Sequence, residues 1–342
     1  MRRLVNSGEA SIYEFTNQQR SIMKFELRRT IVGIALLAAS VASIAQTTIE
    51  FNSMNRKQGF PAILEHRAQY TDKISGVFTR PTNANGSVPV MVIMHSSGGI
   101  NNSTWDWSKF FLDMGIATFV VDSFKPRGIE NTASDQSQLN YAASSADALR
   151  ALKVVSEQPG VDTNRIGVIG FSRGGSAAMT STYPNIRKGV LGENPVKFAL
   201  SVVLYGGYIM SGTTTTPMLY LMGDSDDYQS VEATTAFIAD LKSRGNNVMF
   251  KVYSDATHGF DVERARSSLY LPRVQVWKKC YPRAVDLDSM TFSVDNVVVS
   301  SKEYGESMGK CMTYGVTVSF NRTARDDARN QVKGFVFKTF GL

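Results

Sequence analysis

Histidine and cysteine are scarce in this chain, whose 342 residues include three histidines and two cysteines. The histidines, His66, His95 and His258, stand far apart in the sequence. Metal sites gather several such ligands at short spacings, so the sequence indicates no metal site, and we expect no cofactor. Both cysteines lie near the C-terminus, away from the motifs described below, which argues against thiol catalysis.

Apolar segments long enough to cross a membrane are lacking. The apolar run at residues 31–42 is too short to span comfortably, although a membrane anchor is the alternative interpretation. Basic residues follow Met23, and a small-x-small motif ends at Ala45, which is the pattern of a secretory signal peptide. We therefore expect residues 23–45 to be a signal cleaved near Ala45, and the protein to be secreted or periplasmic without a stable membrane span.

The first 22 residues fit no part of such a signal and form an N-terminal extension, which leaves Met1 or Met23 as the start. No basic cluster follows Ala45, although the chain has a formal net charge of +7, so we expect no nucleic-acid partner.

In an exported protein, Cys280 and Cys311 are expected to form one disulfide, worth about 3–4 kcal/mol by loop-closure entropy. Two unrelated buried thiols are the alternative.

Apolar segments alternate with amphipathic ones from about residue 70. Continuous apolar runs predict strands buried on both faces, and periodic runs predict helices. The expected strands are 73–81, 88–95, 117–124, 165–171, 198–207, 217–224 and 246–255, and the expected helices are 140–156, 229–244 and about 322–339. This alternation predicts an α/β fold with a doubly wound, mostly parallel sheet. We expect residues 46–342 to form a single domain, with an insertion at 262–313 before the last helix.

A G-x-S-x-G motif occupies residues 170–174, between an expected strand and an expected helix. A tight turn there would raise the hydroxyl of Ser172 above the sheet, and the crowding requires glycine on both sides. Ligands of such sheets bind at the carboxyl ends of the strands, where this turn lies. A plain glycine-rich turn or an anion-binding helix N-terminus is the alternative interpretation.

A serine nucleophile needs a base, and the base needs an orienting carboxylate. In this fold the order along the chain is Ser, Asp or Glu, then His, which only His258 satisfies. The segment after strand 217–224 offers three acids. Spacing favours Asp226 as the carboxylate, with Asp227 next and Asp224 last.

Five segments, "HSSGG", "DSFKPRG", "GFSRGG", "GDSDD" and "THGFD", resemble the dienelactone hydrolase family in order and spacing. The resemblance covers about residues 70–261, and the last helix is also similar. It implies the α/β-hydrolase fold, with Ser172 as nucleophile, His258 as base and Asp226 as acid. The family's founding enzyme has a cysteine nucleophile, so the serine here favours a general serine esterase.

The oxyanion of a tetrahedral intermediate needs hydrogen-bond donors. We expect the backbone N–H of Arg173, after the nucleophile, and that of Ser97, in the loop after strand 88–95. His95 is expected to shape this loop. Trp105 and Trp107 line a substrate pocket or pack in the core.

These features predict an exported serine hydrolase of ester or lactone bonds in small-molecule substrates. Acylation of Ser172 would be followed by hydrolysis with a water that His258 activates. An oligopeptidase-like serine peptidase and a catalytically silent binding protein on the same scaffold are the alternatives. Arg127, in "DSFKPRG", either fixes a loop or binds a substrate carboxylate, and the sequence does not indicate an oligomeric state.

Overall fold

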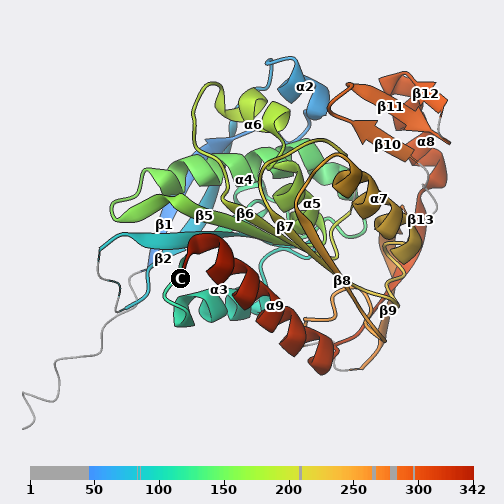
Figure 1. Ribbon diagram of the computed structural model, residues 1–342. Helices are drawn as coiled ribbons and strands as arrows, with labels where there is room; N and C mark the ends of the chain where they lie inside the picture. Colours follow the sequence, from blue (N-terminus) through green and yellow to red (C-terminus); the bar gives the residue numbers. More distant parts are fainter. Residues whose placement is uncertain are drawn as a thin grey trace, which may run out of the picture. The chain divides into compact units, whose positions relative to one another are not determined.

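An eight-stranded mixed sheet forms the centre of the computed structural model (Figure 1). The structure describes residues 46–82, 84, 86–207, 210–263, 267–277, 283–295 and 297–342. The expected signal peptide at 23–45 and Cys280 lie outside these ranges. The strands are β1 (Gln46–Ser53), β2 (Asp72–Thr79), β3 (Val88–Met94), β4 (Ala117–Asp122), β5 (Val161–Phe171), β6 (Leu200–Leu204), β7 (Met218–Gly223) and β8 (Val248–Tyr253).

The strand order is β1-β2-β4-β3-β5-β6-β7-β8. β2 pairs antiparallel with both β1 and β4, while β3 to β8 pair in parallel. Strands β3, β6 and β7 are buried along their whole length, because helices cover both faces of the sheet. This confirms the predicted α/β-hydrolase fold with its doubly wound, mostly parallel sheet.

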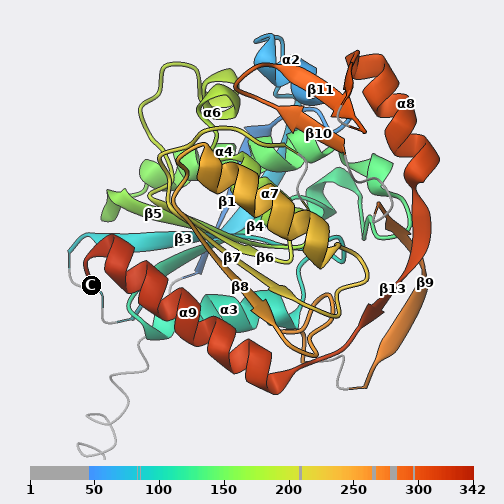
Figure 2. The ribbon, with the colours of Figure 1, turned by 45° about the vertical axis from the view of Figure 1, so that its right-hand side comes forward.

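Helices lie on both sides of the sheet, and Figures 1 and 2 agree on which side each one takes. α3 and α9 cover one face, and α4, α5, α6 and α7 cover the other. The helices that cover the sheet are α3 (Asn102–Asp113), α4 (Tyr141–Ser156), α5 (Arg173–Thr180), α6 (Pro184–Leu191), α7 (Val231–Ser243) and α9 (Arg322–Phe340), and α2 (Phe60–Leu64) is a short turn of helix. Side chains of Asn101, Asn140, Ser230 and Asn321 cap the N-termini of α3, α4, α7 and α9, which sets where these helices begin.

Small sheets form in the segment expected to be an insertion, residues 262–313, and in the residues that directly follow it, up to Val318 (Figure 2). β9 (Leu269–Val276) pairs antiparallel with β13 (Thr313–Val318), and we call this pair the insertion ribbon. Between them in sequence lie β10 (Arg283–Asp286), β11 (Thr291–Val294) and β12 (Val297–Val299), which form a three-stranded sheet, and α8 (Ser301–Cys311). Among the described residues, no helix is both long and apolar enough to span a bilayer.

Arg127 occupies a short 3-10 turn, η1 (Lys125–Arg127), and its side chain is buried with two carboxylates. It donates to both oxygens of Asp147, at 2.7 and 2.9 Å, and to Asp72 at 2.7 Å. Asp147 also accepts a hydrogen bond from Ser53. These carboxylates raise the pKa of Arg127 although burial alone would lower it. Arg127 therefore fixes a loop against β1 and β2, and of the two expected roles the structure supports this one.

We predict that Arg127→Met destabilises the fold by about 3–5 kcal/mol, because Asp147 would be left buried and charged without its partner. Denaturant unfolding measures the difference. Lys109→Met is the matched control, since the Lys109–Asp113 pair is exposed and its loss is expected to cost less than about 0.5 kcal/mol. Equal losses in the two variants would contradict the structural role of Arg127.

Candidate active site

The turn after β5 holds Ser172 in a backbone conformation that side chains rarely adopt, with φ 52° and ψ −115°. Glycine is required on both sides of it. A Cβ on Gly170 would lie 2.0 Å from the carbonyl oxygen of Gly174, and one on Gly174 would lie 2.1 Å from that of Met94. The close approach of bare backbones therefore places the Ser172 hydroxyl at the carboxyl edge of the sheet, before the first turn of α5.

The Ser172 hydroxyl meets the imidazole of His258, which lies in the loop after β8. The distance from His258 Nε2 to Ser172 Oγ is 2.9 Å, and that from His258 Nδ1 to Asp226 Oδ2 is also 2.9 Å. All three side chains are buried, with 4 to 7% of each residue exposed. The structure thus brings together the three residues that the sequence singled out, in the order needed for proton transfer from hydroxyl to imidazole.

Asp226 is fixed by the backbone that follows it. Its Oδ1 accepts hydrogen bonds from the N–H groups of Tyr228 and Gln229, at 2.8 and 2.9 Å, which leaves Oδ2 for His258. The neighbouring acids turn elsewhere. Asp227 accepts from the N–H of Thr317 on β13, and Asp224 accepts from the N–H of Asp255. The three acids therefore have separate partners, and of the three only Asp226 contacts the imidazole.

Two tyrosines enclose the imidazole, and sequence reasoning did not identify either. The Tyr228 ring stacks on His258 with centroids 4.6 Å apart, and Tyr205 meets the imidazole edge-on at 4.8 Å. Tyr205 has a positive φ of 40° at the end of β6, and its hydroxyl donates to the buried carboxylate of Asp261. Burial and then the charge of Asp261 raise the pKa of Tyr205 well above its usual value, so the phenol stays protonated.

Trp107 also donates to Asp261, from Nε1 at 2.8 Å, and its side chain is buried. It therefore packs in the core, whereas Trp105 is 38% exposed on α3. The only advance signal for Asp261 was its place in the motif "THGFD". This carboxylate links α3, β6 and the loop that carries His258.

Ser97 and Arg173, the two expected oxyanion donors, lie on adjoining segments. The backbone of Met94 and His95 packs against Gly174 in the first turn of α5, and Ser97 occupies the turn between Ser96 and Gly99. Within the described part of the chain, the N–H of Ser97 donates to no backbone carbonyl. The N–H of Arg173 is the first of α5, where helices leave donors unpaired. The arrangement therefore supports both residues as donors.

The insertion ribbon contacts the segments around the triad. The N–H of Ser319, just after β13, donates to Thr257 Oγ1 at 2.7 Å, beside His258. From β9, the N–H of Gln275 donates to the carbonyl of Ala133, and Gln275 Oε1 accepts from the N–H of Gln136. Tyr228 packs with Val276 and Val316 of the ribbon. The ribbon thus supports the acid loop, the histidine loop and the loop before α4.

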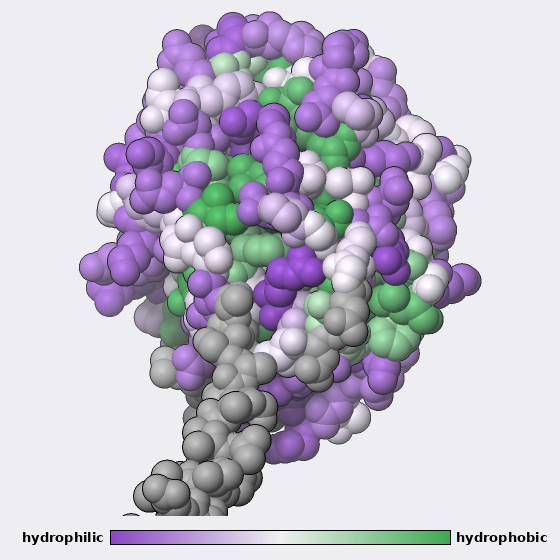
Figure 3. Space-filling view, turned by 90° about the vertical axis from the view of Figure 1, so that its left-hand side faces the viewer, coloured by the Kyte–Doolittle hydropathy of each residue, from purple (hydrophilic) through white to green (hydrophobic). Residues whose placement is uncertain are grey.

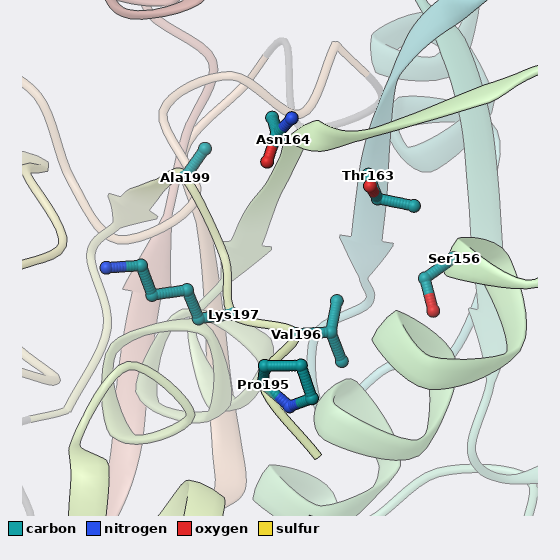
Figure 4. A pocket seen from close by; sticks show the side chains of 7 residues that line it. All are labelled: Ser156, Thr163, Asn164, Pro195, Val196, Lys197 and Ala199. Atoms are coloured by element: carbon teal, nitrogen blue, oxygen red, sulfur yellow. The ribbon is translucent and has the colours of Figure 1, made fainter.

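A pocket of about 370 Å³ lies elsewhere, at the amino ends of β5 and β6 (Figure 4). It is lined by Ser156, Thr163, Asn164, Pro195, Val196, Lys197 and Ala199. Because ligands of such sheets bind at the carboxyl ends, this pocket does not serve the triad.

The face on the left of Figure 1 is largely hydrophilic, with hydrophobic residues grouped near its centre (Figure 3).

Two further expectations concern metals and the disulfide. Over the described ranges, no group of three or more His, Cys, Asp or Glu residues is placed to hold a metal ion. Cys280 lies outside the described residues, so its pairing with Cys311 stays a prediction.

Comparison with known proteins gives a family match over most of the sheet. A family model described as the dienelactone hydrolase family matches residues 74–281. A curated relative from Bradyrhizobium sp, named "Probable 2-oxo-3-(5-oxofuran-2-ylidene)propanoate lactonase", is 23% identical over 194 residues, which are 51% of this chain and 74% of the relative.

Two solved structures are similar to this chain. One, titled m3DLH, is 20% identical with a TM-score of 0.50, covering 65% of this chain and 88% of its own. The other, a dienelactone hydrolase-like promiscuous phosphotriesterase from metagenomic libraries, is 14% identical with a TM-score of 0.47, covering 78% of this chain and 99% of its own.

The burial of His95 predicts how the stability of the fold depends on pH. It is buried at the end of β3, its Nδ1 lies 2.8 Å from the Ser96 carbonyl, and its Nε2 accepts from the N–H of Ser123. Burial lowers the pKa of His95, so the folded protein holds the neutral ring. In the unfolded chain the ring protonates near pH 6.5. The free energy of unfolding therefore falls as the pH drops below that value. We predict that His95→Gln loses less stability than wild type between pH 7.5 and 5.

Denaturant unfolding at both pH values measures this difference. His66, which is exposed, provides the matched control, and His66→Asn is expected to keep the wild-type pH dependence. The loop-shaping role of neutral His95 would be contradicted if His95→Gln and wild type lost the same stability on acidification.

Proposed function

Since the chain belongs to the dienelactone hydrolase family of hydrolases, we propose that it is an exported serine hydrolase cleaving ester or lactone bonds of small substrates. The observation that carries this proposal is the line of contacts from Ser172 Oγ to His258 Nε2 and from His258 Nδ1 to Asp226, each 2.9 Å long. The lactonase name of the Bradyrhizobium relative supports the inclusion of lactones among the substrates.

Acylation begins when Ser172 Oγ attacks the carbonyl carbon and its proton moves to His258 Nε2. Asp226 accepts a hydrogen bond from Nδ1–H of His258, which keeps the imidazole in the tautomer whose Nε2 can take the serine proton. The carboxylate then stabilises the cationic form of the imidazole. The oxyanion is received by the N–H groups of Ser97 and Arg173. Collapse expels the alcohol oxygen, which takes the proton from His258.

Deacylation repeats these steps with water. His258 removes a proton from a water molecule, which attacks the acyl carbon, and the second tetrahedral intermediate collapses to release the acid and the Ser172 hydroxyl. For a lactone the alcohol and acid belong to one molecule, so the product is a hydroxy acid. Tyr205 and Tyr228 hold the imidazole from two sides throughout.

We predict that Ser172→Ala abolishes turnover of p-nitrophenyl acetate and that Asp226→Asn lowers kcat by about 10³- to 10⁴-fold, since the imidazole loses its tautomer control. Asp227→Asn is the matched control. Its amide oxygen can still accept from Thr317, so kcat is expected to fall by less than about tenfold. Initial-rate kinetics on the folded variants measure these effects.

Other outcomes would point to the alternatives. Amide substrates cleaved at rates comparable to esters would favour a peptidase. A folded wild-type protein with no turnover of esters or lactones would favour a binding protein on this scaffold. Full activity in Asp226→Asn together with loss in Asp227→Asn would move the orienting role to the second acid.

Export and the disulfide form part of the same proposal and have their own test. We predict that the protein from its native host is found outside the cytoplasm, and that its intact mass corresponds to a chain starting at Gln46. Thiol alkylation should label Cys280 and Cys311 only after reduction. A cytoplasmic protein that retains residues 23–45, or thiols that react before reduction, would contradict it.

A further inference from the structure

The guanidinium of Arg173 is buried, and none of the carboxylates that the structure describes pairs with it. The residue is 3% exposed, and its five N–H groups all meet neutral acceptors. Nε and Nη2 donate to Gln136 Oε1, Nη2 also to the Gln136 carbonyl at 3.0 Å, and Nη1 to the Leu139 carbonyl and Ser144 Oγ at 2.8 and 3.2 Å. The guanidinium carbon lies 4.1 Å from the centre of the Tyr141 ring.

Buried charges are normally paired, because removing an ion from water is costly. Arg127 follows that rule with two carboxylates, whereas no described carboxylate lies within ion-pair distance of Arg173. Arginine cannot shed its proton to avoid the cost. The fold therefore retains an uncompensated cation on the residue that directly follows Ser172.

Gln136, in the short 3-10 turn η2 (Gln136–Gln138), connects this cation to Ser97. Because Gln136 Oε1 accepts from Arg173, its Nε2 is free to donate to Ser97 Oγ, at 3.1 Å. The insertion ribbon holds Gln136 from the other side, through the bond from its N–H to Gln275 at 2.8 Å. One amide thus links the two residues whose N–H groups receive the oxyanion.

The charge of Arg173 also reaches the imidazole side of the site. Burial raises the pKa of the Tyr228 phenol, and the Arg173 cation opposes that rise. Tyr228 is the ring stacked on His258, so the Arg173 cation and the Asp226 carboxylate, which acts on the same phenol in the opposite sense, both lie near the imidazole.

We propose that the unpaired positive charge of the Arg173 side chain, which Gln136 holds in place, stabilises the oxyanion. This inference rests on the function proposed above. When Ser172 Oγ bonds to the carbonyl carbon, the π electron pair moves to the carbonyl oxygen and the hydroxyl proton moves to His258. The negative charge exists only from that moment. A fixed cation in a site shielded from water then stabilises the transition state more than the bound ester.

Gln136→Glu tests this because it changes charge with little change of shape. The carboxylate can accept the same Arg173 hydrogen bonds, and the Ser97 hydroxyl can donate to it in place of the bond that the amide donated, but the carboxylate neutralises the cation. We expect kcat/KM for p-nitrophenyl acetate to fall by about tenfold or more. Affinity for an alkyl trifluoromethyl ketone, which forms an oxyanion adduct with serine, should fall by a similar factor. Affinity for the methyl ketone of equal chain length, which binds without that adduct, should not change.

Ser144→Asp neutralises the same cation from a second side and keeps the proposal testable if Gln136→Glu does not fold. Ser134→Glu is the control, because it adds the same charge at an exposed position of the same loop, where solvent screens it. The control should stay within about twofold of wild type.

The inference is overturned if folded Gln136→Glu or Ser144→Asp keeps wild-type kcat/KM and wild-type affinity for the trifluoromethyl ketone. It is also overturned if both ketones lose affinity equally, since that would mean a distorted pocket instead of a lost charge. A wild-type protein that turns over no ester would contradict the proposed function itself, and the two failures are therefore distinguishable.

Discussion

The conformation of Ser172 is the constraint on which the site depends. Its positive φ is unfavourable for a side chain, and it persists because three backbone segments meet around it: the end of β5, the first turn of α5 and the end of β3. These segments can meet only because Gly170 and Gly174 have no side chain. The same contact that raises the hydroxyl above the sheet also brings the loop of Ser97 beside the N-terminus of α5.

The rest of the site is built from loops that hold one another in place. Asp226 is fixed by the N–H groups that follow it, His258 lies between two tyrosine rings, and Asp261 anchors one of those rings. The insertion ribbon adds contacts to the loops of Asp226, His258 and Gln136. The ribbon therefore helps to support the site, and substitutions that weaken the pairing of β9 with β13 would disturb these loops.

Much of this architecture could be predicted because it depends on local pattern. The parallel strands are continuous apolar runs, and the G-x-S-x-G motif fixes a tight turn that only one geometry satisfies. Strand β1 was not predicted, because its side chains alternate between exposed and buried only at its second half and it lies at the antiparallel edge of the sheet. The polar N-terminal residues of α3 likewise show no clear helical period in the sequence.

Contacts between distant residues were the part that the sequence could not supply. Nothing near Tyr205 or Tyr228 indicates that their rings meet the same imidazole, because one follows β6 and the other follows the acid loop. Similarly, the three acids near β7 could be ranked by spacing, but only the position of β13 shows that Asp227 faces Thr317. The neutral partners of the Arg173 side chain all lie in residues 136–144, and no local motif at Arg173 indicates that this stretch packs against it.

The central claim is that Ser172 is a nucleophile activated by His258, and labelling with a fluorophosphonate followed by peptide mass spectrometry tests it most directly. The structure predicts one label per folded chain, located on Ser172, formed rapidly at neutral pH and lost in His258→Ala. A folded wild-type protein that remains unlabelled, or one labelled with equal efficiency after His258 is removed, would contradict it.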